Sequence, residues 1–576
     1  MSRPTTILLA FFSFPLATFA ATFTQSARTV DCFDFVEVTV SVASPPEGNP
    51  FAGAEVTGEF ALVVPADRTP SPQAVKVDGF CDHEDGSVFR IRFMPTQPGR
   101  HDYSVTYRRG GAMETHAGSF TARAGQRKGI VRVDREYPNH FVREGSGEHF
   151  FWNSTTTYAL IGWRDDAVIR ESIDRLARLK INRIRAAIVP PRVNSGMQWR
   201  EPVVTNDAHF SFCVNAWPAA RPESVDDPGF GVSRFNVPHW QKFERLLRHA
   251  RERDVMVSVI FYVDGRLKGV DPFRKEGMGG ADEQRFYRYA AARFAAFANV
   301  MWDVTNEYRL FRTNAWAEQM GAFLRACDPY DHLTSIHGHP DFTFRKSAWV
   351  DYAMYQEWDE AGGYDFMLRN RREQAATGRP MPQINEEYGY EDHYPYPWGQ
   401  ARKWPARTAD TRRRLAWEMA MAGTYQTTGE RADIEGMGGW ITGRGNDRMT
   451  MLESYAHLRG FFEAFDWWKL EPRPDLLTIL PDPPLPARAR PRDSAPPTPA
   501  LHGKPVLLAQ PGTCYVAYLP RGGAVTARLD AGSYRTRWFN PRTGQFTGKV
   551  GTAAAGEWIS PPAADAEDWV LLIESM

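Results

Sequence analysis

The chain has little of several features that would each indicate a function. Its 576 residues carry 69 Lys and Arg against 69 Asp and Glu, so no net charge favours nucleic acid or an anionic membrane as a partner. It contains no Gly-rich phosphate loop, no Gly-x-Ser-x-Gly nucleophile motif and no Cys-x-x-Cys pair. We therefore predict that the protein needs neither a cofactor nor a metal.

Cysteine is also scarce. Five residues are an odd number, so at least one thiol is unpaired within a monomer. Cys32 and Cys81 lie in the same N-terminal segment and could form a disulfide in an oxidising compartment. Cys213, Cys327 and Cys514 are scattered, and we expect them to be small buried residues.

Long apolar runs are missing except at the N-terminus. Arg3 precedes an apolar stretch from Ile7 to Ala20 that ends in small residues, which is typical of a secretory signal peptide cleaved near Ala20. The alternatives are a buried strand or an uncleaved anchor, although the run is short for a membrane span. The sequence thus predicts a signal peptide at residues 1–20, a secreted or periplasmic protein, and no membrane contact after cleavage. It leaves the oligomeric state open.

What is present indicates a multidomain protein. Short alternating strands predict a β-sandwich at residues 22–124, and a similar β-sandwich at 506–576. Residues 472–505 are crowded with Pro, Arg and Ala, and we expect an extended linker without sheet or helix. Between these, residues 131–471 alternate strand and helix signals, which predicts a (β/α)8 TIM barrel with its eighth strand at Gly438–Gly443.

Two glutamates stand where this barrel would carry chemistry. The run from Val300 ends in Asn306 and Glu307, and a later run from Met381 ends in Glu386 and Glu387. Counting strands places Glu307 after the fourth and Glu387 after the seventh, so both would face the mouth of the barrel. Glycoside hydrolysis requires two such facing carboxyl groups, ~5–5.5 Å apart in retaining enzymes and ~6.5–9.5 Å apart in inverting ones.

Other motifs show a resemblance to known families. Phe150-Phe151-Trp152, Glu386 to Glu391 and Trp467-Trp468-Lys469-Leu470 resemble the apiosidase-like glycoside hydrolases of clan A. The N-terminal motifs Asn49-Pro50-Phe51 and Gly99 to Tyr103 are similar to the immunoglobulin-like domain that often precedes such barrels. The C-terminal strands resemble the small domain of that family that is named for collagen binding.

The resemblance implies roles for individual residues. It makes Glu307 the acid/base and Glu387 the nucleophile, and it implies that Asn306 binds the hydroxyl next to the reacting carbon. The charge of Glu387 is then expected to raise the pKa of Glu307. Where many relatives have Gly-Asp-Thr-Ala-Trp, this chain has Asn153 to Tyr158, so the substrate of the family cannot be carried over.

Several assignments remain open between function and structure. Glu386 competes with Glu387 for the nucleophile, and its alternative is a salt bridge on the helix side of the barrel wall. Trp440 could stack under the sugar or belong to the core. His337 and His339 invite a metal interpretation, but hydrogen bonding is the more common use of such a pair. The remaining candidates for substrate binding are Arg185, Tyr262, His337 and Tyr355.

Two classes of function fit this sequence. The first is a secreted retaining glycoside hydrolase acting on a plant, algal or microbial polysaccharide or oligosaccharide. The second is a non-catalytic carbohydrate-binding or adhesive protein built on a barrel scaffold. Two carboxylates at the barrel mouth favour the enzyme, because a binding protein has no need of an acid pair.

Overall fold

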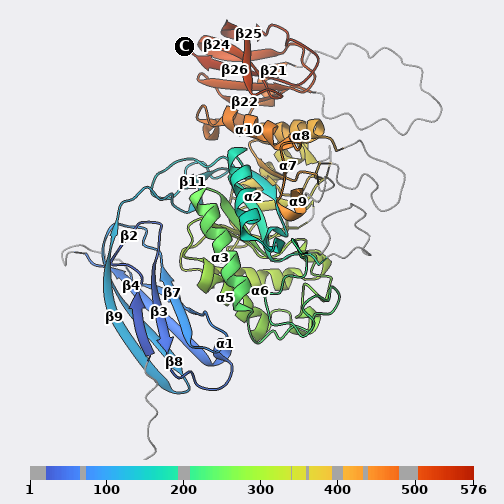
Figure 1. The fold of residues 1–576 in the computed structure, drawn as a ribbon. Coiled ribbons are helices and arrows are strands. Elements are labelled where there is room, and N and C mark those ends of the chain that lie inside the picture. Colours follow the sequence, from blue (N-terminus) through green and yellow to red (C-terminus); the bar gives the residue numbers. More distant parts are fainter. Residues whose placement is uncertain are drawn as a thin grey trace, which may run out of the picture.

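The computed structural model describes residues 21–64, 73–192, 208–338, 340–358, 362–391, 407–431, 439–478 and 504–576. The predicted signal peptide and most of the predicted linker lie outside these ranges. Figure 1 shows three domains in succession, with the barrel between the N-terminal and the C-terminal β domains. The predicted multidomain class is therefore confirmed.

The N-terminal domain is a sandwich of two sheets with strand orders β1-β3-β7-β6 and β2-β9-β8-β4-β5. Strands such as β3 bury every second residue, which explains the alternation in the sequence. Cys32 and Cys81 are both free and buried, so no disulfide joins them. The elements are β1 (Ala21–Gln25), β2 (Thr29–Asp31), β3 (Val36–Val42), α1 (Pro50–Gly53), β4 (Ala54–Leu62), β5 (Val75–Asp78), β6 (Phe80–Cys81), β7 (Val88–Phe93), β8 (Gly99–Arg109) and β9 (Ala112–Arg123).

A short hairpin leads into the barrel, whose eight strands are all parallel. Their order is β16-β15-β14-β13-β12-β19-β18-β17, so β16 and β17 are the ends of a nearly closed ring. The strands are β10 (Val131–Val133) and β11 (Phe141–Arg143) in the hairpin, then β12 (Asn153–Thr156), β13 (Arg183–Val189), β14 (Met256–Tyr262), β15 (Val300–Asp303), β16 (Thr334–Ser335), β17 (Ala353–Tyr355), β18 (Gln383–Asn385) and β19 (Tyr425–Thr428).

The predicted position of the eighth strand was wrong. The eighth strand is β19, Tyr425–Thr428, and residues Gly439–Thr442 form the short helix α9 instead. The β19 sequence Tyr-Gln-Thr-Thr is mostly polar although all four side chains are buried, so its hydrophobic pattern is weak. Glu307 still follows the fourth strand and Glu387 the seventh.

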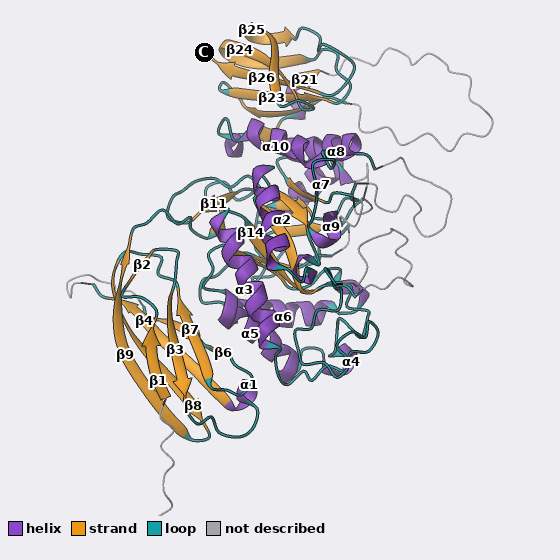
Figure 2. Cartoon of the chain, viewed as in Figure 1, coloured by secondary structure: helices purple, strands orange, loops and turns teal. Residues whose placement is uncertain are grey.

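Helices surround the barrel, as Figure 2 shows. In α2 the side chain of Asp165 accepts a hydrogen bond from the amide of Ala167, and Ile169, Ile173 and Leu176 face the sheet. No helix in the described ranges is long and apolar enough to cross a membrane. The helices are α2 (Asp166–Arg178), α3 (Val237–Glu252), α4 (Arg274–Gly277), α5 (Ala281–Phe294), α6 (Asn314–Cys327), α7 (Tyr364–Ala376), α8 (Ala409–Met421), α9 (Gly439–Thr442) and α10 (Met451–Phe462).

The C-terminal domain is an antiparallel sheet that begins before the predicted linker ends. Glu471–Pro472 (β20) pairs with β22, and Leu477–Thr478 (β21) pairs with β24, so part of the segment predicted to lack regular structure belongs to this sheet. Residues 479–503 lie outside the described ranges. The other strands are β22 (Val506–Gln510), β23 (Cys514–Leu519), β24 (Thr526–Asn540), β25 (Gln545–Ile559) and β26 (Trp569–Ser575).

Buried arginines join both outer domains to the helices of the barrel. Arg92 of β7 donates to both carboxylate oxygens of Glu244 on α3, at 2.8 and 2.9 Å. On the opposite side, Arg413 of α8 donates to Asp568 at 2.7 and 3.1 Å. Such two-pronged contacts have a defined geometry, so they orient the outer domains on the barrel.

Candidate active site

Glu307 sits just beyond the end of β15 in an unusual backbone conformation. Its φ of 46° and ψ of 47° lie in the left-handed region, which a residue with a side chain rarely adopts. The amide of Glu307 donates to Nδ1 of His337 at 3.4 Å, and the amide of Tyr308 donates to the carbonyl of His337 at 3.3 Å. His337 thus helps to hold a turn that is costly by itself, as is common at functional sites.

The carboxylate of Glu307 has a donor on each oxygen. Nδ2 of Asn306 donates to one oxygen at 3.4 Å, and Nε2 of Gln356 donates to the other at 3.1 Å. Asn306 was predicted as a site residue and Gln356 was not. Gln356 follows β17, the sixth strand, so its position near the rim was the only available signal.

Glu387 follows β18 and is almost fully buried. The hydroxyl of Tyr158 donates to its carboxylate at 3.2 Å and lies 3.1 Å from the hydroxyl of Tyr390. Nε2 of His337 is 3.9 Å from the same carboxylate oxygen. Because Nδ1 of His337 accepts from the amide of Glu307, the neutral ring carries its proton on Nε2, toward Glu387.

The two carboxyl groups interact electrostatically. Burial first, and then the negative charge of Glu307, raise the pKa of Glu387 from 4.5 to about 8, against the opposing charge of Arg185. The sequence led us to expect that the charge of Glu387 raises the pKa of Glu307; the structure shows the reciprocal effect on Glu387, and the effect on Glu307 stays a prediction. The charge of one carboxyl group therefore favours a proton on the other.

Arg185 of β13 connects the surroundings of the two carboxyl groups. Its guanidinium donates to Asn306 at 2.9 Å and to Tyr158 at 3.1 Å, and these residues contact Glu307 and Glu387 respectively. It also donates to Asp303 at 2.9 Å. The side chain has no exposed surface, so Arg185 is a positioning residue and does not reach a substrate in this conformation.

Glu386 lies inside the barrel, which corrects the predicted alternative of a helix-side salt bridge. Its carboxylate pairs with Arg183 at 2.6 Å and with Arg185 at 3.0 Å, and accepts from Thr427 at 2.9 Å. These partners belong to the second and eighth strands, β13 and β19, and only the interior brings them together. Glu386 is fully buried beneath the site and is not placed to attack a substrate.

We expect Glu386→Gln to impair catalysis through Arg185. Losing one member of a buried ion pair costs about 3–5 kcal/mol of stability, and it leaves Nε of Arg185 without its carboxylate. With one negative charge fewer nearby, the pKa of Glu387 should fall, so the alkaline limb of kcat/KM should move to lower pH while KM changes little. Kinetics across pH would measure this.

Glu430→Gln is the matched control. Glu430 is also buried, follows β19, and pairs with Arg175 at 2.7 and 2.9 Å away from both carboxyl groups of the site. It should lose stability and keep the pH profile. An unchanged alkaline limb in Glu386→Gln would refute the positioning role.

The structure separates the other predicted residues into two groups. Trp440, on α9, stacks on Tyr390 with 4.9 Å between ring centres and lies edge-on to Tyr158, so it belongs to the site wall. The hydroxyl of Tyr262 donates to Glu283 at 3.0 Å, and that of Tyr355 donates to Gln383 at 2.6 Å. Both hydroxyls are thus engaged within the protein, away from Glu307 and Glu387. His339 lies outside the described residues.

Sequence reasoning missed the two tyrosines beside Glu387. In the sequence, Tyr158 belongs to the segment that departs from the family pattern, and Tyr390 belongs to the motif from Glu386 to Glu391, but neither was predicted as a site residue. Their contact with each other and with Glu387 joins the first strand to the seventh. No local pattern in the chain could have revealed it, although their position just after barrel strands was a signal.

Three family models match successive parts of the chain. The model of the apiosidase-like catalytic domain matches residues 137–429, a domain of unknown function (DUF5060) matches 29–108, and the "Putative collagen-binding domain of a collagenase" matches 502–574. Among curated proteins, none matches the chain.

Solved structures share the fold at low sequence identity. A "putative glycoside hydrolase" from Bacteroides vulgatus ATCC 8482 is 20% identical with a TM-score of 0.71, and the match covers 96% of this chain and 100% of that one. A glycoside hydrolase family 5 structure from the same organism is 12% identical with a TM-score of 0.56, covering 78% and 93%. Since the catalytic-domain model spans half of the sequence and the whole barrel up to its eighth strand, the chain belongs to the apiosidase-like family of glycoside hydrolases.

Proposed function

We propose that the protein is a retaining glycoside hydrolase that cleaves O-glycosidic bonds in a plant, algal or microbial polysaccharide or oligosaccharide. One observation carries this proposal: Glu307 and Glu387, from the fourth and seventh strands, interact closely enough for the charge of one to raise the pKa of the other. A shared proton on such a pair is what double displacement requires, because one carboxyl must donate a proton while the other attacks.

The residues fit two successive displacements. In the first, Glu307 gives its proton to the glycosidic oxygen, the carboxylate of Glu387 attacks the anomeric carbon, and the leaving sugar departs. In the second, Glu307 takes a proton from water, the water oxygen attacks the same carbon, and Glu387 is released. The hydroxyl of Tyr158 can stabilise the anionic form of Glu387, to which it already donates.

The surrounding residues support substrate binding by the same site. Asn306 touches Glu307 and Arg185, so its amide is held where a sugar hydroxyl next to the reacting carbon would lie. Trp440 stacks on the ring of Tyr390 beside Glu387, and because both rings are buried they support the sugar-binding site from behind. We further propose export to the periplasm or the medium, on the strength of residues 1–20.

The configuration of the product tests the mechanism. Following hydrolysis of an aryl glycoside by NMR, we expect the first-formed sugar to keep the anomeric configuration of the substrate, because two inversions restore it. An inverted first product would replace the proposal with a single displacement. The rival function, a non-catalytic adhesive protein, predicts no hydrolysis of any glycoside by the wild type.

A further inference from the structure

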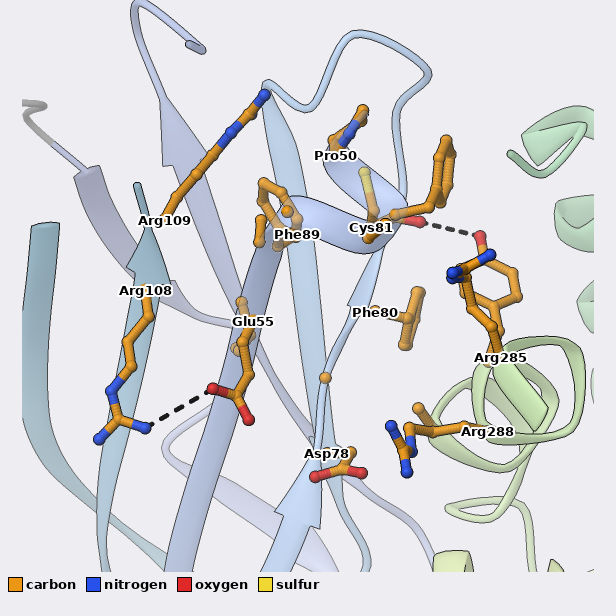
Figure 3. Close-up of a pocket in the computed structure, with 18 of the residues that line it drawn as sticks. Pro50, Glu55, Asp78, Phe80, Cys81, Phe89, Arg108, Arg109, Arg285 and Arg288 are labelled. Atoms are coloured by element: carbon orange, nitrogen blue, oxygen red, sulfur yellow. Dashed lines mark hydrogen bonds and ion pairs between the residues drawn. The ribbon is translucent and has the colours of Figure 1, made fainter. Parts of the chain in front are cut away.

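A groove of about 1170 Å³ lies between the N-terminal sandwich and the barrel. Figure 3 shows its two walls: strands of the sandwich on one side, and the helix that carries Arg285 and Arg288 on the other. The second wall consists of α5 together with Phe323, Ala326 and Cys327 of α6. None of its lining residues is among the partners of Glu307 and Glu387 described above for the candidate active site.

The groove is locally basic although the whole chain has no net charge. Four arginines line it against two acidic residues, Glu55 and Asp78. Glu55 has a partner on its own wall, Arg108, at 3.6 Å. Arg109 is buried and donates to the carbonyl of Pro46, so it anchors a loop of the sandwich. The cations that remain available to a ligand are therefore on α5.

Arg285 and Arg288 present two guanidinium groups on one face of α5. Residues three apart on a helix are neighbours, with about 5–6 Å between their Cβ atoms. Arg288 is exposed, lies 5.3 Å from the ring centre of Phe323 and interacts with the thiol of Cys327. Its charge opposes the burial that raises the pKa of Asp78 on the facing wall, but among the described residues no carboxylate forms a salt bridge with it. Within the described ranges, Arg285 forms one ion pair, with Asp282 one turn back on the same helix. Both keep donors for a ligand.

We propose that this groove binds an acidic glycan, a chain of sugars that carry carboxylates. Two arginines three residues apart, with about 5–6 Å between their Cβ atoms, can reach carboxylates on neighbouring sugar rings of such a chain. Arginine binds carboxylate with two parallel hydrogen bonds, and the apolar part of the lining, including Phe323 and Met113, suits the C–H faces of sugar rings.

This inference rests on the proposed function for its purpose, since a second binding site would hold a polymer near the catalytic carboxyl groups. The binding itself does not require hydrolysis. Glycan binding in the groove and hydrolysis at the candidate active site can therefore be tested by separate measurements, and either proposal can be rejected without the other.

Isothermal titration of the full-length protein with hexagalacturonate tests the groove. We expect the wild type to bind at millimolar concentration or below, with affinity falling as salt is added. The Arg285→Ala/Arg288→Ala double variant should bind at least about 10-fold more weakly, because two charge-assisted contacts are lost. It should still hydrolyse a small aryl glycoside as the wild type does.

Arg369→Ala is the matched control. Arg369 is likewise exposed on a helix, α7, and lies 5.5 Å from the ring centre of Phe366, but it is outside the groove. It should bind hexagalacturonate normally. Maltohexaose, a neutral hexasaccharide, should bind the wild type much more weakly.

Three outcomes would overturn the groove assignment: no binding of hexagalacturonate by the folded wild type, equal binding by the double variant, or equal binding of maltohexaose. Binding without hydrolysis of any glycoside would instead keep the groove and reject the proposed function. Thermal unfolding of the double variant verifies that it is folded.

Discussion

Replacing Glu387 with Gln is expected to reduce kcat by at least about 10⁴-fold, because the amide cannot attack the anomeric carbon. The substitution should not lower the stability of the folded protein. The folded protein raises the pKa of Glu387 from 4.5 to about 8, which means that the fold disfavours the ionised form. Gln is neutral, so above pH 4.5 the variant should unfold at the same temperature as the wild type or higher. Steady-state kinetics and thermal unfolding measure the two effects.

The combination of lost turnover and retained stability separates chemistry from misfolding. Added azide should restore cleavage in Glu387→Ala, because the small anion fits the space of the removed carboxylate and attacks in its place. The resulting glycosyl azide should have the inverted configuration. A Glu387→Gln protein that turns over within about tenfold of the wild type would remove Glu387 from the mechanism.

The order of strands and helices was readable because the buried strands are apolar. Val255 to Tyr262 is an uninterrupted apolar run but for Ser258, and α2 repeats Ile169, Ile173 and Leu176 on one face. The failure at β19 has the opposite cause. Gln426 forms hydrogen bonds with Asn153 and Tyr388 inside the barrel, and Thr427 donates to Glu386. Because these buried side chains are polar, the strand has no hydrophobic pattern by which it could be predicted.

The positions of the two key glutamates were predictable because they depend on strand count alone. Their surroundings were not. Alternation predicted that Glu386 and Glu387 face opposite sides, but β18 ends at Asn385, and beyond it the backbone need not alternate. Both side chains are therefore on the inner side, one bound to Arg183 and the other to Tyr158. Tyr262 and Tyr355 show the reverse error, since a place near a strand end does not fix where a hydroxyl points.

Replacing Glu307 with Gln is expected to lower kcat/KM by about 10²–10⁴-fold on substrates with poor leaving groups, because the proton donor is lost. A dinitrophenyl glycoside needs no protonation to depart, so its first step should be nearly unaffected. Its second step lacks the general base, and the glycosyl-enzyme should accumulate as a burst of dinitrophenol. Rapid-mixing measurements with both substrate types would show the difference.

The same variant tests the electrostatic coupling. In the wild type, rising pH removes the shared proton near the pKa of about 8, so kcat/KM should decline above it. Without the charge of Glu307, the pKa of Glu387 should drop, although burial still holds it above 4.5. On the dinitrophenyl substrate, Glu307→Gln should therefore lose the alkaline decline and become active at lower pH, because ionised Glu387 is all that the first step requires. If the alkaline decline persists in this variant, or if good and poor leaving groups suffer equally, the proton that limits catalysis does not belong to the Glu307–Glu387 pair.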